Sequence, residues 1–337
     1  MTWQHLTDDD VPGRRRSSRP RTKQRPAHAD ALPAMVTCVD RGRYLTRLGA
    51  RDVVAVKARE MGHRSVVVGD QAFLVGDTSG AKDTLARIVR VGPRRTELRR
   101  ATEEGAGRER VIVANADRMV IVAALADPPP RTGMIDRQLV AAYDAGLDAV
   151  LCLTKRDLGN DSALRALYEP LGVEVVATGL GPGLGQGPER GLAQVRELLA
   201  QRVSVLVGHS GVGKSTLMNE LVPGAGRATG AVNLVTGKGR HTSSSALALE
   251  LEGGGWVIDT PGVRSFGLSH VRPERVLAAF GDLAEAAAAC PRACPHGPET
   301  AECALRQWAV SSQERQLRVD SYLRIVASGL ARGSKNG

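Results

Sequence analysis

Hydrophobic positions follow two different patterns along the chain. Between Ala34 and about Ala101, short runs rich in valine alternate with turns marked by glycine. This pattern predicts about five short strands, and strands at such spacing form a small barrel or sandwich, of which the five-stranded oligonucleotide-binding barrel is one example. The expected strands are Met35–Cys38, Asp52–Val56, Arg64–Val68, Ala72–Val75 and Ala86–Val91.

From about Val111 onward, apolar strands alternate with segments of helical spacing. Alternation of this kind predicts an α/β domain with a mainly parallel sheet, whose sites lie at the carboxyl ends of the strands. The expected strands are Met119–Leu125, Ala149–Leu153, Val173–Ala177, Val203–Val207, Ala246–Leu251 and Trp256–Ile258, and the expected helices are Ile135–Ala145, Leu164–Tyr168, Leu192–Leu199 and Thr216–Leu221. Beyond His270 the pattern predicts helices, the last of them over Gln313–Ile325.

Composition narrows the class of protein. The chain has 337 residues, which predicts about two domains, or three if one of them is small. Its longest apolar run, Met119–Ala126, is far shorter than a membrane span, and its N-terminus lacks the pattern of a secretory signal. We therefore expect a cytoplasmic protein that does not cross a membrane. A net charge of +10 favours a polyanionic partner such as nucleic acid.

A phosphate-binding loop follows the strand Val203–Val207. The segment Gly208–Ser215 fits G-x-x-x-x-G-K-[ST], and it stands between a strand and a helix, as that motif requires. Its glycines let backbone amides point at phosphate oxygens, Lys214 neutralises phosphate charge, and Ser215 holds Mg²⁺. The loop predicts a nucleoside triphosphate without naming its base.

Two further segments complete the nucleotide site. The strand ending in Asp259 is followed by Gly262, and this pair can bind Mg²⁺ through water and sense the γ-phosphate. The segment Thr154–Asp157 delivers a carboxylate to the sheet edge, where it can accept two hydrogen bonds from guanine. The GTPase pattern has asparagine at the position of Thr154. The Asp157 carboxylate also disfavours one alternative hypothesis, in which the protein is an ATP-using enzyme with a phosphate loop.

The order of these segments is reversed relative to an ordinary GTPase. Asp157 precedes the phosphate loop, although the base-recognising segment normally follows it far downstream. We interpret this order as a circular permutation, which is tolerated where old termini lie close together at the surface. The glycine-rich segment 179–188 lies at or near the join.

Together these segments make the chain resemble the circularly permuted family of ribosome small-subunit-dependent GTPase A. The segments that match are Gly208–Thr216, Gly237–Thr242, Asp259–Leu268, Thr154–Asp157 and the cysteine cluster near the C-terminus. The resemblance implies an oligonucleotide-binding barrel, a permuted G domain and a zinc-bearing helical domain. It also implies GTP hydrolysis stimulated by the small (30S) ribosomal subunit during late maturation, with 16S rRNA and GTP or GDP as partners and a monomeric protein.

Catalysis depends on residues near the γ-phosphate. Val263 stands where many GTPases place a water-orienting glutamine, so another group must position the nucleophile. Chemistry and the family pattern both suggest His241; the alternative is a loop histidine that contacts RNA. Thr242 or Ser243 would add a second hydroxyl on Mg²⁺. Lys238 and Arg240 are expected to contact RNA phosphates, with transition-state stabilisation as the alternative.

The expected site residues follow from these segments. Lys214 and His241 are the catalytic candidates, and Ser215 and Thr242 the Mg²⁺ ligands. GTP binding is assigned to Thr154, Lys155, Arg156, Asp157, Gly208, His209, Ser210, Gly211, Val212, Gly213, Lys214, Ser215, Thr216, Asp259 and Gly262.

Near the C-terminus, three cysteines and a histidine lie within 14 residues. Cys290, Cys294, His296 and Cys303 form a donor set suited to one tetrahedral Zn²⁺. Because the protein supplies all four ligands, we expect a structural ion that stabilises a domain too small to build its own core. Cys38 and Cys152 are expected to be buried strand residues.

The domain organisation expected from these observations has four parts. Residues 1–33 form a basic disordered arm, which either contacts phosphates or is a solvated tail. Residues 34–105 form the oligonucleotide-binding barrel, 106–269 the circularly permuted α/β G domain, and 270–337 the zinc-binding helical domain. The rival to a GTPase is an RNA-binding protein that uses GTP as a conformational ligand with negligible turnover.

Overall fold

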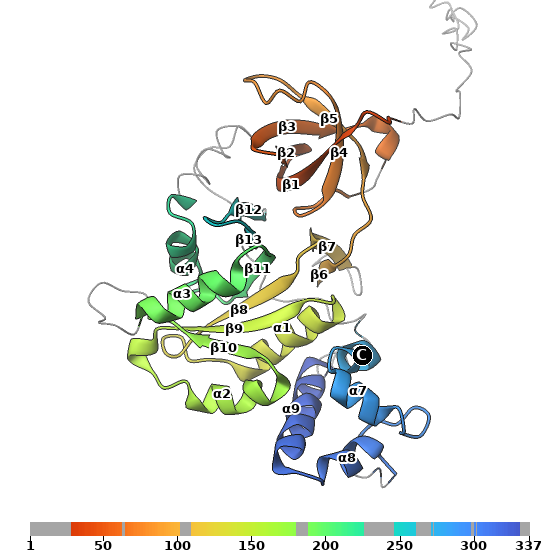
Figure 1. Cartoon of the computed structure of the whole chain (residues 1–337), viewed down its shortest axis with the longest axis vertical. Coiled ribbons are helices and arrows are strands. Elements are labelled where there is room, and N and C mark those ends of the chain that lie inside the picture. The colour runs from red at the N-terminus through yellow and green to blue at the C-terminus, as the bar shows by residue number, and fades with distance from the viewer. Residues whose placement is uncertain are drawn as a thin grey trace, which may run out of the picture.

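The structure, a computed structural model, describes residues 28–62, 65–101, 109–179, 188–225, 246–260, 271, 273–297, 300 and 302–330. Figure 1 shows three parts stacked along the long axis: a small barrel, a sheet flanked by helices, and a group of C-terminal helices. The nucleotide segments predicted above lie in the middle part.

The N-terminal part is a closed five-stranded barrel, as predicted. Its strands follow the order β1-β2-β3-β5-β4, and β4 pairs again with β1. The strands are β1 (Leu32–Asp40), β2 (Arg43–Leu48), β3 (Arg51–Lys57), β4 (Gln71–Gly76) and β5 (Ala86–Val91), with a short 3₁₀ turn at Arg59–Met61. Alternate residues point inward, so Val36, Leu74 and Ile88 are fully buried in a core of the barrel's own.

One expected strand of the barrel is replaced by another. In the described part of Arg64–Val68, residues 65–67 are not strand, because the Val67 amide donates to the Asp70 carboxylate (2.8 Å) and so is not available to a neighbouring strand. Only Val68 makes a bridge, to Val113. The fifth barrel strand is instead β2, which was not predicted; it contains Arg43 and Arg47 but buries Tyr44 and Thr46.

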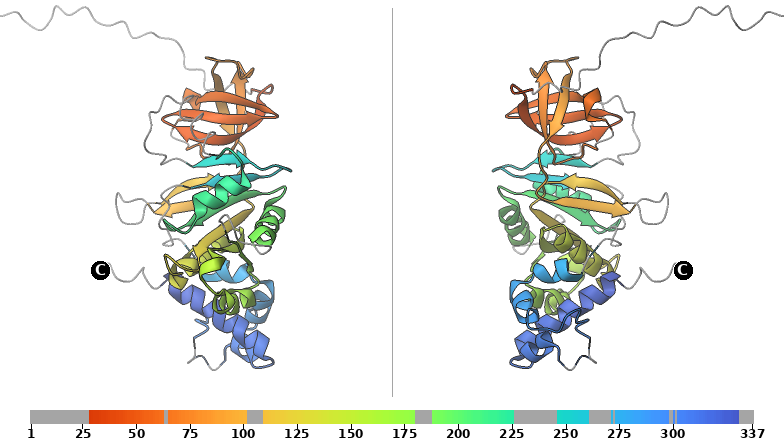
Figure 2. Two further views of the ribbon diagram at one scale, coloured as in Figure 1. Left: turned by 90° about the vertical axis from the view of Figure 1, so that its left-hand side faces the viewer. Right: turned by 90° about the vertical axis from the view of Figure 1, so that its right-hand side faces the viewer.

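The middle part is a six-stranded sheet in the order β10-β9-β8-β11-β13-β12, parallel except for β12. Its strands lie where the sequence predicted them: β8 (Arg118–Ala124), β9 (Asp148–Thr154), β10 (Glu174–Ala177), β11 (Val203–Gly208), β12 (Leu247–Glu250) and β13 (Trp256–Asp259). Strand β12 also touches the barrel through one bridge, Leu247 to Cys38. Figure 2 shows β12 and β13 directly beneath the barrel.

Helices cover both faces of this sheet. Helices α3 (Pro188–Leu199) and α4 (Lys214–Leu221) share a buried cluster with one face. Helices α1 (Thr132–Asp144) and α2 (Ser162–Tyr168) cover the other, with 3₁₀ turns at Arg156–Leu158 and Glu169–Leu171. The strands are therefore buried on both sides, which explains their nearly continuous apolar sequences.

The C-terminal helices pack on the α1 face. They are α6 (Pro273–Ala278), α7 (Gly281–Ala287), α8 (Ala304–Ala309) and α9 (Gln313–Leu330). Phe280 packs edge-on against Tyr143 of α1 and Tyr322 of α9, with ring centroids 4.8 and 5.7 Å apart. The buried side chains of these C-terminal helices belong to the same apolar cluster as the buried side chains on this face of the sheet.

A polar joint connects the barrel to the sheet. It contains the hairpin of β6 (Glu97–Ala101) and β7 (Glu109–Ala114). The Arg94 guanidinium donates two hydrogen bonds to the fully buried Asp70 carboxylate, at 2.7 and 2.9 Å. A Cβ at Gly69 would lie 1.9 Å from the Ala114 carbonyl oxygen, so only glycine permits this close backbone approach.

Candidate nucleotide site and metal centre

The phosphate loop leaves the sheet at its centre. Strand β11 is buried between β8 and β13, and the loop after it leads directly into helix α4, which begins at Lys214. Gly213 has φ +87°, a left-handed conformation that places the loop amides around the helix N-terminus. Ser210, Ser215 and Thr216 are exposed there, so the predicted phosphate-binding groups face solvent at one sheet edge.

Lys214 and Asp259 meet at this edge. In the parallel pairing of β11 with β13, Leu206 lies beside Asp259, which places the carboxylate next to the loop. The Lys214 ammonium makes an ion pair with the Asp259 carboxylate, and the two side chains are 15% and 29% exposed. An anion and Mg²⁺ arriving here would each find an oppositely charged group already in place.

Thr154 connects the base-recognising segment to the phosphate loop. Its side chain is buried, and its hydroxyl donates a 2.6 Å hydrogen bond to the Val212 carbonyl. A hydroxyl has a single proton, so while this bond is made Thr154 has none to donate to a base. The threonine thus ties two segments 58 residues apart but leaves base recognition to its neighbours.

The neighbours of Thr154 are arranged around the ends of β8, β9 and β10. Lys155 has φ +57°, and its ammonium donates to the Asp127 carbonyl after β8. The Arg156 amide donates to the Thr178 carbonyl after β10 (3.2 Å). Asp157 is exposed, and its carboxylate has no hydrogen-bond partner among the described residues. This carboxylate is available to a ligand at the same sheet edge as Lys214.

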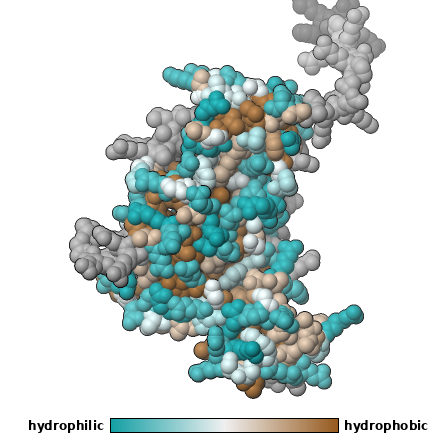
Figure 3. All heavy atoms as spheres, in the orientation of Figure 1, coloured by the Kyte–Doolittle hydropathy of each residue, from teal (hydrophilic) through white to brown (hydrophobic). Residues whose placement is uncertain are grey.

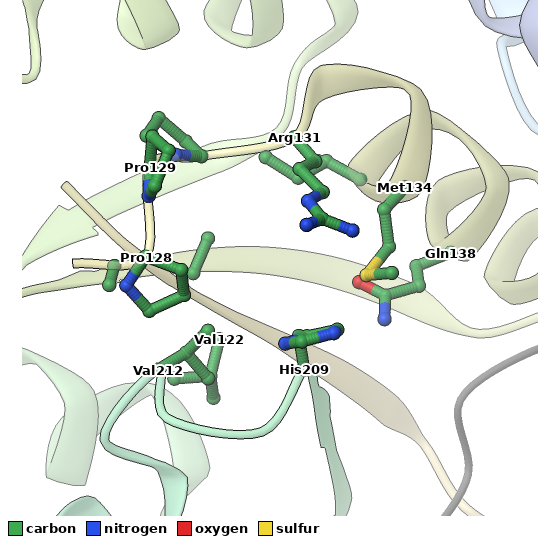
Figure 4. Close-up of a pocket in the computed structure, with 12 residues that line it drawn as sticks. Val122, Pro128, Pro129, Arg131, Met134, Gln138, His209 and Val212 are labelled. Carbon is green, nitrogen blue, oxygen red and sulfur yellow. The ribbon is translucent and has the colours of Figure 1, made fainter. Parts of the chain in front are cut away.

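A small pocket beside the phosphate loop was not expected from the sequence. His209 faces Arg131 and Gln138 of the α1 region across it, with Pro128 and Val212 at its side (Figure 4). Its volume of about 30 Å³ has room for one water molecule. The sequence feature that could have indicated this pocket is the turn Asp127–Arg131, because it follows β8 at the edge of the sheet where ligands bind.

Several predicted residues lie outside the described part of the chain. These are Lys238, Arg240, His241, Thr242, its alternative Ser243, and Gly262 together with Val263, as well as residues 1–27 of the basic arm and 180–187 of the glycine-rich segment. Their roles stay predictions.

The four predicted metal ligands come together. Their ligand atoms lie within 4.8 Å of one another, and His296 Nδ1 is 3.7 Å from Cys290 Sγ and 3.5 Å from Cys303 Sγ. Zinc bonds of about 2.3 Å to sulfur and 2.0 Å to nitrogen, meeting at the tetrahedral angle, separate those atoms by roughly 3.5 Å. The donor set and its spacing therefore fit a tetrahedral ion.

Burial shifts the pKa values of two of these ligands in opposite directions. It lowers the pKa of His296, which favours the neutral imidazole that binds metals. It raises the pKa of the Cys303 thiol, so an ion would be needed to hold that group as a thiolate at neutral pH. Elsewhere, Cys38 and Cys152 are buried strand residues as predicted, and burial raises the pKa of Cys152 to about 12.

A phosphate loop on the central strand, tied by Thr154 to a base-recognising segment that precedes it in the chain, defines a circularly permuted P-loop GTPase. The model of the RsgA GTPase family matches residues 91–269. The chain belongs to this family.

Relatives extend the similarity beyond the G domain. The chain is 36% identical over 271 residues to the small ribosomal subunit biogenesis GTPase RsgA of Pseudomonas fluorescens, which covers 78% of this chain and 75% of that protein. It is 33% identical over 313 residues to the RsgA of Chlorobaculum tepidum, covering 89% of this chain and 98% of that protein.

Solved structures share the fold. YjeQ from Thermotoga maritima superposes with a TM-score of 0.62 at 22% identity, covering 90% of this chain and 99% of that one. YloQ, described as a circularly permuted GTPase, superposes with a TM-score of 0.64 at 21% identity, covering 92% and 98%. Among the described residues, no helix is both long and apolar enough to cross a bilayer.

Proposed function

We propose that this GTPase binds the small (30S) ribosomal subunit and hydrolyses GTP during its late maturation. The observation that carries the proposal is the extent of the similarity: the Chlorobaculum relative, named for small-subunit biogenesis, is matched over 98% of its length, flanking parts included. A shared G domain alone would account for nucleotide binding but not for a common partner.

In this proposal the phosphate loop cradles GTP from Gly208 to Thr216. Lys214 exchanges its ion pair with Asp259 for the phosphates, and Asp259 becomes free to hold Mg²⁺ through water, with Ser215 as a direct ligand. Mg²⁺ supplies charge neutralisation at the β- and γ-phosphates when bound.

Guanine recognition is assigned to Asp157, with Lys155 and Arg156 beside it. The Asp157 carboxylate is exposed and can accept two hydrogen bonds from guanine N1 and N2, which adenine does not offer in that arrangement. Thr154 acts by positioning, since its hydroxyl is bonded to the phosphate loop.

Turnover is assigned to groups outside the described residues. His241 positions the attacking water, Thr242 adds a ligand to Mg²⁺, and Gly262 senses the γ-phosphate. The pocket at His209, which has room for one water molecule, lies on the side of the phosphate loop that faces α1. We therefore assign His209 to nucleotide binding by the loop and not to the chemical step.

The Cys3His cluster is proposed to hold one structural Zn²⁺. Cys290, Cys294, His296 and Cys303 fill a tetrahedral shell, so no position is open for a substrate. The ion would fix the loop between α7 and α8.

The flanking parts are proposed to contact 16S rRNA, in keeping with the net charge of +10. We assign the basic arm to residues 1–33, the barrel to 34–105, the G domain to 106–269 and the zinc domain to 270–337. The protein would act in the cytoplasm as a monomer.

The decisive experiment measures GTP turnover with and without purified small subunits at several salt concentrations. We expect stimulation that falls as salt rises, because docking through phosphates releases counterions. Unstimulated, negligible turnover despite tight GTP binding would favour the rival, an RNA-binding protein that uses GTP as a ligand.

Two variants test the site itself. Lys214→Ala should abolish nucleotide binding, because the phosphate charge loses its main compensation. Asp157→Ala should weaken GTP binding while leaving weak ATP binding unchanged. Unaltered GTP affinity in either variant would remove the corresponding assignment.

A further inference from the structure

The segment between β8 and α1 lies against the phosphate loop and ends at an arginine. It contains three consecutive prolines, Pro128–Pro130, whose rings restrict the backbone. A Cβ added at Gly211 of the phosphate loop would lie 3.6 Å from Pro128 Cδ, so the two segments are in van der Waals contact. Arg131 follows the prolines and precedes the first turn of α1. A stiff segment therefore holds Arg131 beside the phosphate loop.

The charge of Arg131 is not neutralised by the protein around it. Its side chain is directed into the pocket beside the phosphate loop (Figure 4), and it makes no ion pair or hydrogen bond with any described residue. The segments 180–187, 226–245 and 261–270, which lie outside the described residues, contain no aspartate or glutamate. They therefore offer no carboxylate to this guanidinium, which is available to an anion at the phosphate loop.

Two acceptors in the pocket can orient the guanidinium. Gln138 is only 5% exposed, its side chain makes no hydrogen bond within the described part of the chain, and its carboxamide points into the pocket (Figure 4). His209 Nδ1 donates to the Ser210 carbonyl (2.8 Å), which leaves Nε2 of the neutral ring as an acceptor.

A buried carboxamide without a partner is costly, so this pocket favours a donor such as the Arg131 guanidinium. Arginine carries five N–H donors in one rigid plane. Contacts to Gln138 and His209 therefore leave further donors for a phosphate.

We propose that Arg131 is a catalytic residue of GTP hydrolysis, whose guanidinium is oriented by Gln138 and His209 and contacts the γ-phosphate. In the reaction, water forms a bond to the γ-phosphorus while the bond to the β–γ bridging oxygen breaks. The electron pair of that bond goes to GDP, and both protons of the water end on inorganic phosphate. Arg131 exchanges no proton, because arginine stays protonated, and it stabilises the charge that develops on the phosphate oxygens.

This role adds to the groups assigned above and accounts for a feature of the sequence. Val263, at the position of the usual glutamine, has no polar group to offer the reaction. A cation supplied by the chain itself lowers the barrier at a different point, the charge on the phosphates. The inference rests on the phosphate-loop assignment of the proposed function but not on a ribosomal partner.

The test measures single-turnover hydrolysis of GTP by the full chain without ribosomes, together with the affinity for a fluorescent mant derivative of GDP. Arg131→Ala should hydrolyse GTP about 100-fold more slowly, as expected for the loss of one donor to the transition state. Its affinity for mant-GDP should change by less than about twofold, because GDP has no γ-phosphate. Arg131→Lys should recover only part of the rate, since an ammonium lacks the planar fork.

The matched control is Arg110→Ala, which removes an exposed arginine of β7 that does not line the pocket and should keep the parental rate. An unchanged rate in Arg131→Ala would overturn the proposal. So would equal losses of rate and of mant-GDP affinity, because these would indicate a structural role.

Orientation by the pocket is tested with Gln138→Leu, which keeps the size of this buried side chain but removes its carboxamide. The substitution should slow hydrolysis by about tenfold in the parent protein and have no further effect in Arg131→Ala, because it acts through the guanidinium. Gln138→Glu, which keeps an acceptor, should retain most of the rate. Additive losses in the double variant would contradict the contact between Gln138 and Arg131.

Failure of the phosphate-loop assignment looks different. In that case Lys214→Ala would keep its affinity for mant-GDP, and the loop would not be the nucleotide site. Loss of that affinity in Lys214→Ala, combined with normal turnover in Arg131→Ala, would overturn the role of Arg131 alone.

Discussion

The barrel and the C-terminal helices flank the same G domain but are attached to it in different ways. The C-terminal helices share its apolar core: Phe280, Leu305 and Tyr322 belong to one buried cluster with strand and α1 residues such as Met119 and Leu139. The barrel has a core of its own, and it contributes the buried Val68 and the partly buried Met35 and Val39 to the larger cluster.

Polar and backbone contacts add to this apolar contact at the barrel. They include the Asp70–Arg94 pair, the close backbone approach at Gly69, the bridge from Cys38 to Leu247, and Asn115, whose side-chain amide donates to the Gly69 carbonyl (3.0 Å) and accepts from the Arg95 backbone amide (2.9 Å). On the face of the molecule in Figure 3, hydrophilic residues cover most of the surface, with hydrophobic patches among them, one of which lies on the barrel. The barrel therefore has a core of its own, whereas the C-terminal helices share the core of the G domain's sheet.

Removal of the zinc ion that we propose for the Cys3His cluster should give the largest effect. Structural zinc contributes about 10–16 kcal/mol in isolated zinc peptides, as much as the whole stability of a domain. Chelation should therefore expose the backbone amides of α7, α8 and α9, whose core depends on the G domain and on the ion. Hydrogen exchange with mass spectrometry should show this loss with unchanged protection in β1–β5. Equal loss in both regions would refute the difference in attachment.

Phe280→Ala should come next. Truncating this buried ring between Tyr143 and Tyr322 costs about 3–5 kcal/mol. Because the core is shared, the G domain and the C-terminal helices should both unfold at a lower temperature, and GTP binding should be lost at the same temperature as the helices. Leu74→Ala, a truncation inside the barrel core, is the matched control and should lower the barrel's stability while GTP binding persists. Thermal unfolding with and without GTP distinguishes the two variants.

Asn115→Ala should have a smaller and more local effect. It deletes two hydrogen bonds at the joint, with a cost of about 1–3 kcal/mol. Exchange should accelerate at the Ala114 amide, which donates to the Val68 carbonyl at 3.0 Å. Asn160→Ala, which removes an exposed turn contact inside the G domain, is the control. Unchanged exchange at Ala114 would mean that Asn115 does not orient the barrel.

The smallest effect is a pH dependence confined to the helices. Hydrogen bonds from Arg318 lower the pKa of Asp282, so the pair stabilises the fold above the ordinary carboxyl pKa near 4 and is lost as pH falls through the lowered value. Since both side chains are partly exposed, the contribution is at most about 1 kcal/mol. The difference in thermal midpoint between the parent protein and Asp282→Asn should shrink from pH 7 to pH 3. A constant difference would assign the effect to something other than this carboxylate.

Much of the fold followed from contiguous patterns. The strand before the phosphate loop, the loop and α4 are neighbours in sequence, and their apolar and glycine positions predicted them where they lie. The metal ligands were equally predictable, because three thiols and one imidazole within 14 residues can reach a common centre whatever the surrounding fold.

The amino-acid sequence by itself therefore determined the local helices, strands and loops, and the metal-binding and nucleotide-binding side chains that they carry. Only tertiary structure decided that β2 would replace an apolar run as a barrel strand, that the Thr154 hydroxyl would bond to the phosphate loop, and that a small pocket would form beside His209. The physical reason is range: local patterns depend on the periodicity of neighbouring residues, whereas these features depend on partners many residues apart whose meeting is set by how sheets and helices pack.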